Sequence, residues 1–186
     1  MADPAKRRAT YEDLLAVPKH LVAEIIHGEL VTHPRPAAVH ARAASILGSE
    51  LTGPFDRGKG GPGGWLILDE PELHLHGHIL VPDLAGWRRA RMPVLPDAAA
   101  FEIAPDCVCE VLSPATAATD RADKMPIFAA EKVQNLWFID PVTQTLEAYR
   151  LDTERYTVLG VWRGDVVVRV EPFDAVPLEL GALWSK

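Results

Sequence analysis

The chain has 186 residues, a formal net charge of −7 and apolar side chains at 48% of its positions. This length and composition predict a globular protein with a substantial core, and they exclude a protein coated in basic surface, although a local basic groove stays open. The sequence has no run of about 18 uncharged apolar residues and no apolar leader near its charged N-terminus, so we expect a cytoplasmic protein without a membrane partner.

The first third of the sequence predicts a tail, a hairpin and a helix. Residues 1–10 are predicted to be a disordered tail, and residues 11–186 a single domain. Leu21 to Thr32 has two short apolar runs around His27-Gly28, where glycine suits a hairpin turn. Ala37 to Leu51 has several alanines and places its larger apolar residues at helical spacing, which predicts the first helix.

Strands dominate the rest of the chain, after a predicted glycine-rich loop at Arg57 to Trp65. Three short apolar runs predict buried strands: Trp65 to Leu68, Ile79 to Trp87 and Cys107 to Leu112. Thr119-Asp120 offers a cap for a helix over Arg121 to Val133, in which Pro126 takes an early position or causes a kink. Asn135 to Asp140 is a further strand, and TLEAYRL, RYTVLGVW and DVVVRVEPF continue as β structure. The expected fold class is therefore mixed α/β, built on a sheet.

Two carboxylates interrupt these apolar strands, Asp83 in ILVPDLAGW and Glu110 in CVCEVL. Burying an ionised carboxylate without a partner is costly, so such residues are usually paired, hydrogen-bonded or bound to a metal. Strand periodicity places Glu110 on the face opposite Cys107 and Cys109. Either carboxylate alone could simply cap the following turn. Together, on neighbouring strands, they could hold Mg²⁺, which prefers oxygen ligands and could activate a water for attack on a phosphodiester.

Lys124, on the helix that follows the Glu110 strand, could complete this chemistry. A cation there would orient or deprotonate the attacking water and offset developing negative charge. The alternative is an ordinary solvated helix lysine.

Other polar and sulfur-containing groups allow two interpretations each. Cys107 and Cys109 point the same way on one strand, which is poor geometry for a disulfide and indicates reduced core residues rather than metal ligands. The histidines of HLHGH could ligate a transition metal from one strand face, unless a tight turn at His76-Gly77 breaks their alignment; they are His74, His76 and His78. Three arginines that follow the Asp83 strand could contact nucleic-acid phosphates or pair with nearby acids; they are Arg88, Arg89 and Arg91.

The sequence resembles a known family along most of its length, from about Tyr11 to the C-terminus. The segments ELVTHPRPAAVHARAASILGSEL, VPDLAGW, CEVLSPATAATDRADK and NLWFIDP are similar to those of the Uma-two family of restriction-endonuclease-like proteins, a branch of the PD-(D/E)XK nuclease superfamily. The resemblance implies a restriction-endonuclease-like core of a helix, three strands, a helix and a strand. An N-terminal hairpin and a C-terminal β extension would flank this core.

The resemblance also implies a metal site. Asp83 and Glu110 would be its acidic ligands, with the backbone carbonyl of Val111 a third. The superfamily's lysine usually lies two residues after the second acid, but Leu112 occupies that position here. In this family the lysine is displaced to the following helix, which points to Lys124.

Two further residues, Glu24 and His40, match family positions and are expected to complete the catalytic site. The chain departs from the family pattern after the lysine. Phe128 replaces a common tyrosine, and Lys132 replaces a common glycine at the end of the helix, where glycine is best suited to a left-handed cap. Neither departure touches the proposed metal ligands.

The leading hypothesis is thus an endonuclease that hydrolyses DNA with Mg²⁺ or Mn²⁺ as cofactor. A homodimer is expected, because the two strands of a duplex call for two symmetry-related sites. The alternative is a catalytically silent nuclease-fold module that binds nucleic acid or a protein partner, a reading that the negative net charge favours.

Overall fold

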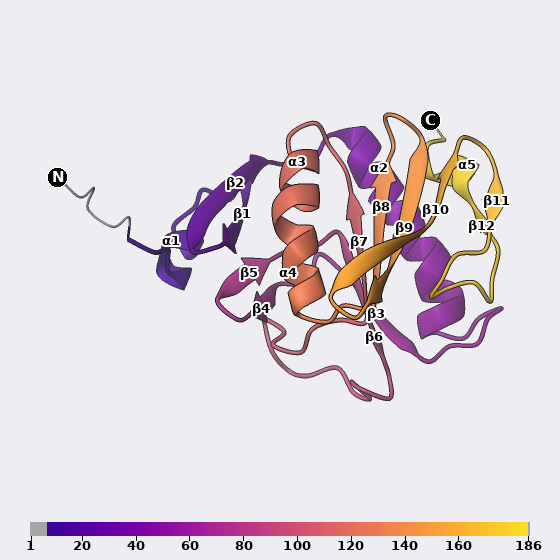
Figure 1. Cartoon of the computed structure of the whole chain (residues 1–186), viewed down its shortest axis with the longest axis horizontal. Helices are drawn as coiled ribbons and strands as arrows, with labels where there is room; N and C mark the ends of the chain where they lie inside the picture. Colours follow the sequence, from indigo (N-terminus) through magenta and orange to yellow (C-terminus); the bar gives the residue numbers. More distant parts are fainter. Residues whose placement is uncertain (1–6, 186) are drawn as a thin grey trace.

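The computed structural model describes residues 7–185 and contains two principal sheets (Figure 1). The larger sheet consists of β10 (Arg155–Arg163), β9 (Thr145–Asp152), β8 (Asn135–Asp140), β7 (Cys107–Val111), β6 (Leu84–Arg88) and β3 (Trp65–Asp69), in that spatial order. The smaller sheet consists of β2 (Glu29–Pro34), β1 (Leu21–Ile26), β5 (His78–Leu80) and β4 (Leu73–Leu75). Within the larger sheet only β7 and β8 run parallel, which is the pair joined by a helical crossover.

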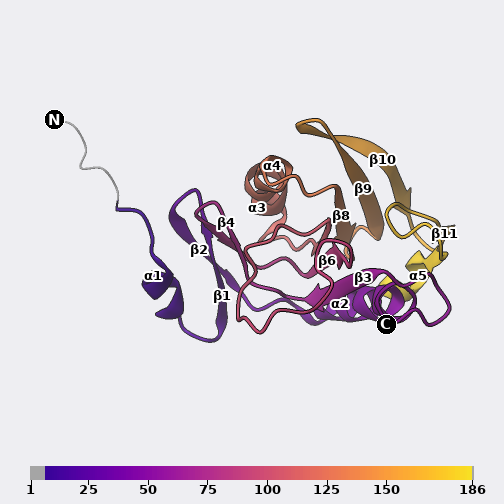
Figure 2. The ribbon, with the colours of Figure 1, turned by 90° about the horizontal axis from the view of Figure 1, so that it is seen from below.

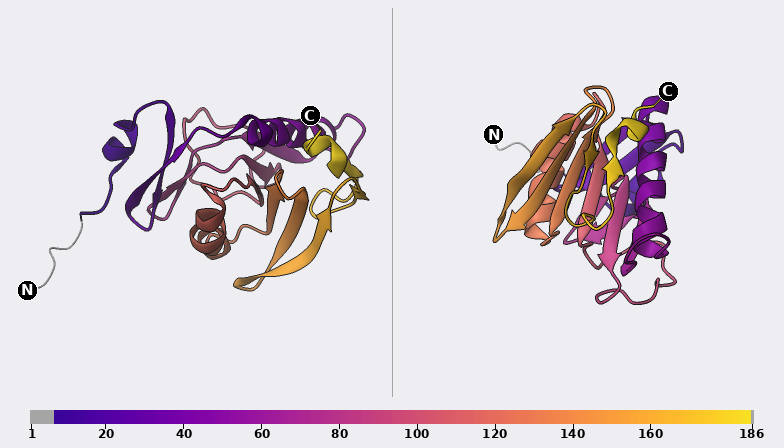
Figure 3. Two further views of the ribbon diagram at one scale, coloured as in Figure 1. Left: turned by 90° about the horizontal axis from the view of Figure 1, so that it is seen from above. Right: turned by 90° about the vertical axis from the view of Figure 1, so that its right-hand side faces the viewer.

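Helical segments cover both faces of the larger sheet (Figure 3). One face carries α2 (Ala38–Leu51), continued by a π-helical turn η1 (Thr52–Asp56), and α5 (Leu180–Leu183). The other carries α3 (Ala117–Thr119), the π-helical turn η2 (Asp120–Lys124) and α4 (Met125–Ala130), which follow one another without a break. The expected order of helix, three strands, helix and strand is present as α2, β3, β6, β7, the α3–α4 segment and β8.

The alternation of side chains along β7 builds the two cores between these layers. Cys107, Cys109 and Val111 face the α2 side, where they pack in one cluster with Leu47 and other residues of α2. Val108 belongs to the opposite cluster, together with Phe128 and Ile127 of α4. Both cysteines are buried free thiols, so their prediction as reduced core residues is confirmed.

The N-terminal hairpin forms as predicted and joins the smaller sheet, which projects from the rest of the molecule together with α1 (Tyr11–Leu15) (Figure 2). His27 and Gly28 both take positive φ angles, of 53° and 80°, as the tight turn requires. Of the predicted tail, residues 1–6 lie outside the described residues. Ala9 donates a hydrogen bond to the Gly28 carbonyl of the hairpin, and Thr10 caps α1 through Asp13, so the last residues of that segment contact the hairpin and α1.

The prediction of one strand over Ile79 to Trp87 is wrong. The segment forms two strands, β5 and β6, which belong to different sheets. The break falls at Val81-Pro82-Asp83, where proline has no N–H for a strand ladder. The short strand β4, which pairs with β5, was not predicted.

The predicted start of the second helix is also wrong. Helical structure begins at Ala117, so Thr119 and Asp120 lie inside it, and Thr116 is the residue that precedes it. Pro126 lies in the first turn of α4, directly after the π-helical turn, which is one of the two positions that the sequence predicts for it.

Most of the predicted C-terminal β structure is confirmed as the β9–β10 hairpin. The last run, DVVVRVEPF, contributes only β11 (Val167–Val168), which pairs with β12 (Leu178–Glu179) outside both principal sheets. No helix within residues 7–185 is long and apolar enough to cross a membrane.

Candidate active site

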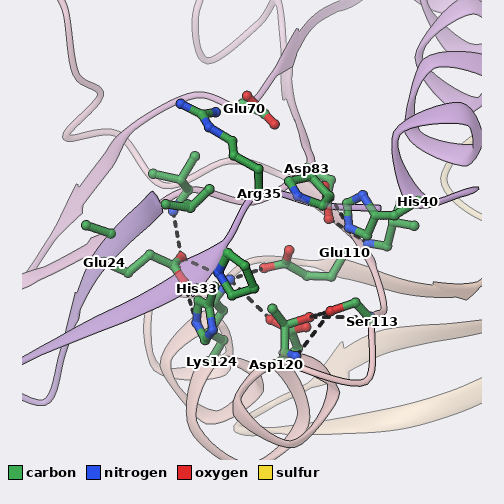
Figure 4. Close-up of a pocket in the computed structure, with 17 residues that line it drawn as sticks. Glu24, His33, Arg35, His40, Glu70, Asp83, Glu110, Ser113, Asp120 and Lys124 are labelled. Carbon is green, nitrogen blue, oxygen red and sulfur yellow. Dashed lines mark hydrogen bonds and ion pairs between the residues drawn. The ribbon is translucent and has the colours of Figure 1, made fainter. Parts of the chain in front are cut away.

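The predicted site residues meet in a pocket where the two sheets and the α3–α4 segment come together (Figure 4). The smaller sheet contributes Glu24 and His33, and the start of α2 contributes His40. The larger sheet and the segments at its edge contribute the carboxylates of Glu70, Asp83 and Glu110 and the backbone of Val111. The turn η2 supplies Asp120 and Lys124.

Asp83 and Glu110 are neighbours across two paired strands. Leu84 of β6 lies opposite Cys109 of β7 in antiparallel register. Asp83 precedes Leu84 and Glu110 follows Cys109, so the two carboxylate residues lie at the same end of this strand pair. The amide of Val111 donates a hydrogen bond of 2.7 Å to Oδ2 of Asp83, which fixes that carboxylate against β7. The prediction that the two strands lie in the same sheet is confirmed, although Asp83 itself falls in the break that precedes β6.

Lys124 is a buried ammonium surrounded by three buried carboxylates. Its Nζ lies 2.9 Å from Oε1 of Glu24, 3.2 Å from Oε1 of Glu110 and 3.2 Å from Oδ1 of Asp120. The alternative of a solvated lysine is therefore wrong, since the side chain is only 5% exposed. Glu24 is itself anchored, because the Val81 amide donates a 2.8 Å hydrogen bond to its Oε1.

Burial and the charges of this cluster shift the pKa of both Lys124 and Glu110. Burial raises the pKa of Glu110 well above its usual value, and Asp120, Asp83 and Glu24 raise it further, while Lys124 opposes them. Burial lowers the pKa of Lys124, but Glu110, Glu24 and Asp120 outweigh it and the net pKa is raised well above the usual value. Lys124 is therefore a fixed positive charge rather than a proton acceptor at neutral pH.

His40 faces the other carboxylate. Its Nε2 lies 3.3 Å from Oδ1 of Asp83. Burial lowers the pKa of His40, but the hydrogen bond and charge of Asp83, together with the carbonyl of Val111, raise the net pKa above its usual value. Within the described part of the chain, Nδ1 of this ring is buried without a hydrogen-bond partner.

Several residues of the pocket were not predicted as site residues, among them Asp120 and His33, which contact its charged groups. Asp120 is four residues before Lys124, a spacing that brings side chains together on a helix and could have identified it. His33 lies with Nε2 3.9 Å from Oε2 of Glu24. In the hairpin, His33 lies opposite Val22, which shares a strand face with Glu24. Because the turn at His27-Gly28 fixes this register, the sequence could have identified His33 as well.

The predicted nucleic-acid-binding arginines are not brought to this pocket, because Arg88 is the last residue of β6, at the end away from Asp83, and Arg89 and Arg91 come after it. Arg89 lies 2.6 Å from Asp56, and Arg91 lies 2.9 Å from Asp106. Arg88 stacks over the ring of Trp65 at 4.4 Å. These contacts match the alternative of a basic segment paired with nearby groups, and phosphate binding by the three arginines stays a prediction.

The histidines of HLHGH separate because His76 and Gly77 form the predicted turn between β4 and β5. His74 contacts Glu72 at 2.7 Å, and His76 contacts Glu131 at 2.7 Å. His78 accepts a hydrogen bond from the His27 amide. Each imidazole thus has a different partner, and nowhere within residues 7–185 do three His, Cys, Asp or Glu side chains form a metal-binding group.

The fold and the acidic pocket with its buried lysine define a restriction-endonuclease-like protein. The crystal structure of "a putative nuclease belonging to DUF820" from Anabaena variabilis is similar to the chain, with a TM-score of 0.74 and 25% sequence identity over 95% of this chain and 97% of that one. The model of the family Uma2, described as "Putative restriction endonuclease", matches residues 8–180. The chain therefore belongs to the Uma2 family, as its sequence predicts. No curated protein matches it.

Proposed function

We propose that the protein is a metal-dependent endonuclease that hydrolyses DNA phosphodiester bonds. The observation that carries this proposal is the convergence of Asp83, Glu110 and Lys124 in one pocket, with Lys124 Nζ 3.2 Å from Glu110 Oε1. The family to which the chain belongs and the similar structure, described as "a putative nuclease", support the same class of reaction.

The donor atoms of the pocket suit a hard divalent cation. Asp83 and Glu110 offer carboxylate oxygens and Val111 a backbone carbonyl, the ligand types that Mg²⁺ prefers while it keeps several waters. Each oxygen of Asp83 takes part in one contact, to His40 or to the Val111 amide, so lone pairs remain. When bound there, Mg²⁺ or Mn²⁺ would polarise the phosphodiester and lower the pKa of a coordinated water.

The protein's own side chains would hold the reacting groups in place. The charge of Lys124 would position the attacking water and stabilise negative charge that develops on the phosphate. Glu24 fixes Lys124 from the smaller sheet at 2.9 Å, and His40 orients Asp83 from α2. Because Lys124 stays protonated, this assignment gives it an electrostatic role rather than that of a general base.

The experiment is cleavage of supercoiled plasmid DNA with Mg²⁺, with and without EDTA. Asp83→Asn keeps the shape of the side chain and an oxygen that can accept the hydrogen bond from the Val111 amide. This variant should abolish nicking while circular dichroism shows the wild-type fold. Asp123→Asn is the matched control, since Asp123 adjoins Lys124 but does not line the pocket. Equal cleavage by Asp83→Asn and the parent would contradict the assignment.

One observation favours the alternative of a silent nuclease-fold module. Lys124 contacts three carboxylates at once, an arrangement that could serve stability alone. A parent protein that binds no Mn²⁺ and cuts no DNA would support this alternative. A homodimer also stays a prediction, which sedimentation of the parent with and without a DNA duplex tests.

A further inference from the structure

The pocket has an excess of acidic groups for a site that must receive an anionic phosphodiester. Five carboxylates line it, from Glu24, Glu70, Asp83, Glu110 and Asp120. Among the described residues that line it, the lysines and arginines are Lys124 and Arg35. Lys124 is already surrounded by three carboxylates, so little of its charge is left to attract a substrate from solution.

Arg35 differs from Lys124 in its exposure and its partners. It is exposed and lies at the edge of the pocket, on the same side as Glu70 (Figure 4). Its Nη2 donates a 3.1 Å hydrogen bond to the carbonyl of Lys19, a neutral acceptor. Within residues 7–185 no carboxylate forms an ion pair with it. Most donors of its guanidinium, which suits the geometry of phosphate oxygens, are therefore available.

The backbone around Arg35 holds this side chain at the pocket. Pro34 and Pro36 flank Arg35. The ring of Pro34 fixes its own φ, and Pro36 restricts the backbone of Arg35 to extended conformations. The helix α2 begins just beyond, after Ala37, with no side-chain cap and no acidic residue in its first turn. The partial positive charge at that helix end adds to the charge of Arg35.

The arginines beyond β6 offer no such free charge. Arg89 and Arg91 each pair with an aspartate, and Arg88 stacks over Trp65. We propose that Arg35 binds a backbone phosphate of the nucleic-acid substrate beside the bond to be cut, an inference that rests on the proposed nuclease function. Arg35 would thereby supply the positive charge for the substrate, because the other cation of the pocket, Lys124, is paired with carboxylates of the protein.

The test is binding of a short fluorescein-labelled DNA duplex, measured by anisotropy with Ca²⁺ over a series of salt concentrations. Arg35→Ala should weaken binding roughly tenfold, the value of one charged hydrogen bond. The slope of log affinity against log salt should fall by about 1, as expected for one lost phosphate contact. Arg35→Lys should restore the slope but only part of the affinity. Arg42→Ala is the matched control, because Arg42 is exposed on the first turns of α2 but lies outside the pocket.

The outcomes separate this inference from the proposed function. If Arg35→Ala matches the parent in affinity and slope, or if the parent binds no duplex, the role of Arg35 is wrong. If Arg42→Ala weakens binding as much as Arg35→Ala, the effect is general surface charge and the role of Arg35 is again wrong. A parent that binds in the predicted manner but never cleaves DNA contradicts the nuclease proposal and leaves phosphate binding by Arg35 standing.

Discussion

The ammonium of Lys124 lies 3.2 Å from Oε1 of Glu110, and both side chains are almost completely buried. Two more buried carboxylates, from Glu24 and Asp120, contact the same ammonium. With every group ionised, this cluster holds three negative charges and one positive charge in a region of low dielectric constant. We therefore expect the stability of the protein to depend on these four side chains, and removal of the cation or of one anion to change it in opposite directions.

Removing the cation should strongly destabilise the protein. Lys124→Met leaves three buried carboxylates without their common partner, and we expect a loss of about 3–5 kcal/mol of unfolding free energy at neutral pH. The loss should shrink as the pH falls, because protonation of the carboxylates removes their repulsion. Urea denaturation at several pH values measures this, with Lys59→Met, in the exposed glycine-rich loop, as control. A loss that stays the same in acid would contradict the electrostatic explanation.

Neutralising one of the anions should have the opposite effect. The pKa of Glu110 is higher in the folded than in the unfolded state, so the folded state binds this proton more tightly. Stability should consequently fall as the pH rises from the ordinary glutamate range through the raised pKa. Glu110→Gln does not titrate and escapes that loss. We expect it to be more stable than the parent by about 1–2 kcal/mol at alkaline pH.

The check for Glu110→Gln is a series of thermal unfolding curves from acid to alkaline pH. The difference from the parent should close towards acid, where Glu110 of the parent is protonated in both states. Glu50→Gln, an exposed site on α2, should follow the parent throughout. If Glu110→Gln is instead the less stable protein at alkaline pH, the attraction of Lys124 outweighs the cost of burying the carboxylate.

Local patterns in the sequence were sufficient to propose Asp83 and Glu110 as neighbouring carboxylates, and they offered Lys124 as one candidate for their cation. The period of two along β7 put Glu110 and the cysteines on opposite faces, and the two cores confirm it. Antiparallel pairing of β6 with β7 then brings Asp83 beside Glu110. These relationships depend on the geometry of a strand over a few residues, which can be predicted from the alternation of apolar and polar residues in the sequence.

The contact of Glu24 with Lys124 could not be predicted in the same way. It requires the smaller sheet, in which Ile25 of β1 pairs with Ile79 of β5, far along the chain. The break at Pro82 that sends β5 into that sheet was missed, because an apolar run does not show where a strand changes sheet. The partner of Glu24 thus depends on tertiary packing, and only the family resemblance indicated that it belonged to the site.

Lys132 stands where the family resemblance implies a glycine, and it allows the energetic cost of a left-handed helix end to be measured. Its φ is 62°, and the Val133 amide donates to the Phe128 carbonyl at 3.0 Å, so the chain keeps a glycine-type cap with a side chain that is strained in it. Lys132→Gly should raise the unfolding free energy by roughly 1 kcal/mol. Lys132→Ala keeps the strain but loses the 3.2 Å contact of Nζ with the Thr153 carbonyl. Urea denaturation should therefore show a gain for glycine alone, and equal changes in both variants would contradict the strain argument.

Metal binding should depend on Asp83 and Glu110 and not on the histidine-containing turn. Isothermal titration of the parent with Mn²⁺ should show a binding event that disappears in Glu110→Ala and in Asp83→Asn, because each removes one of the two proposed carboxylate ligands. The double variant His74→Ala with His76→Ala should bind as the parent does, since those imidazoles contact Glu72 and Glu131 outside the pocket. Binding that survives Glu110→Ala but is lost in the histidine variant would move the metal site to the β4–β5 turn. In that case the acidic pocket would lose its proposed role in phosphodiester hydrolysis.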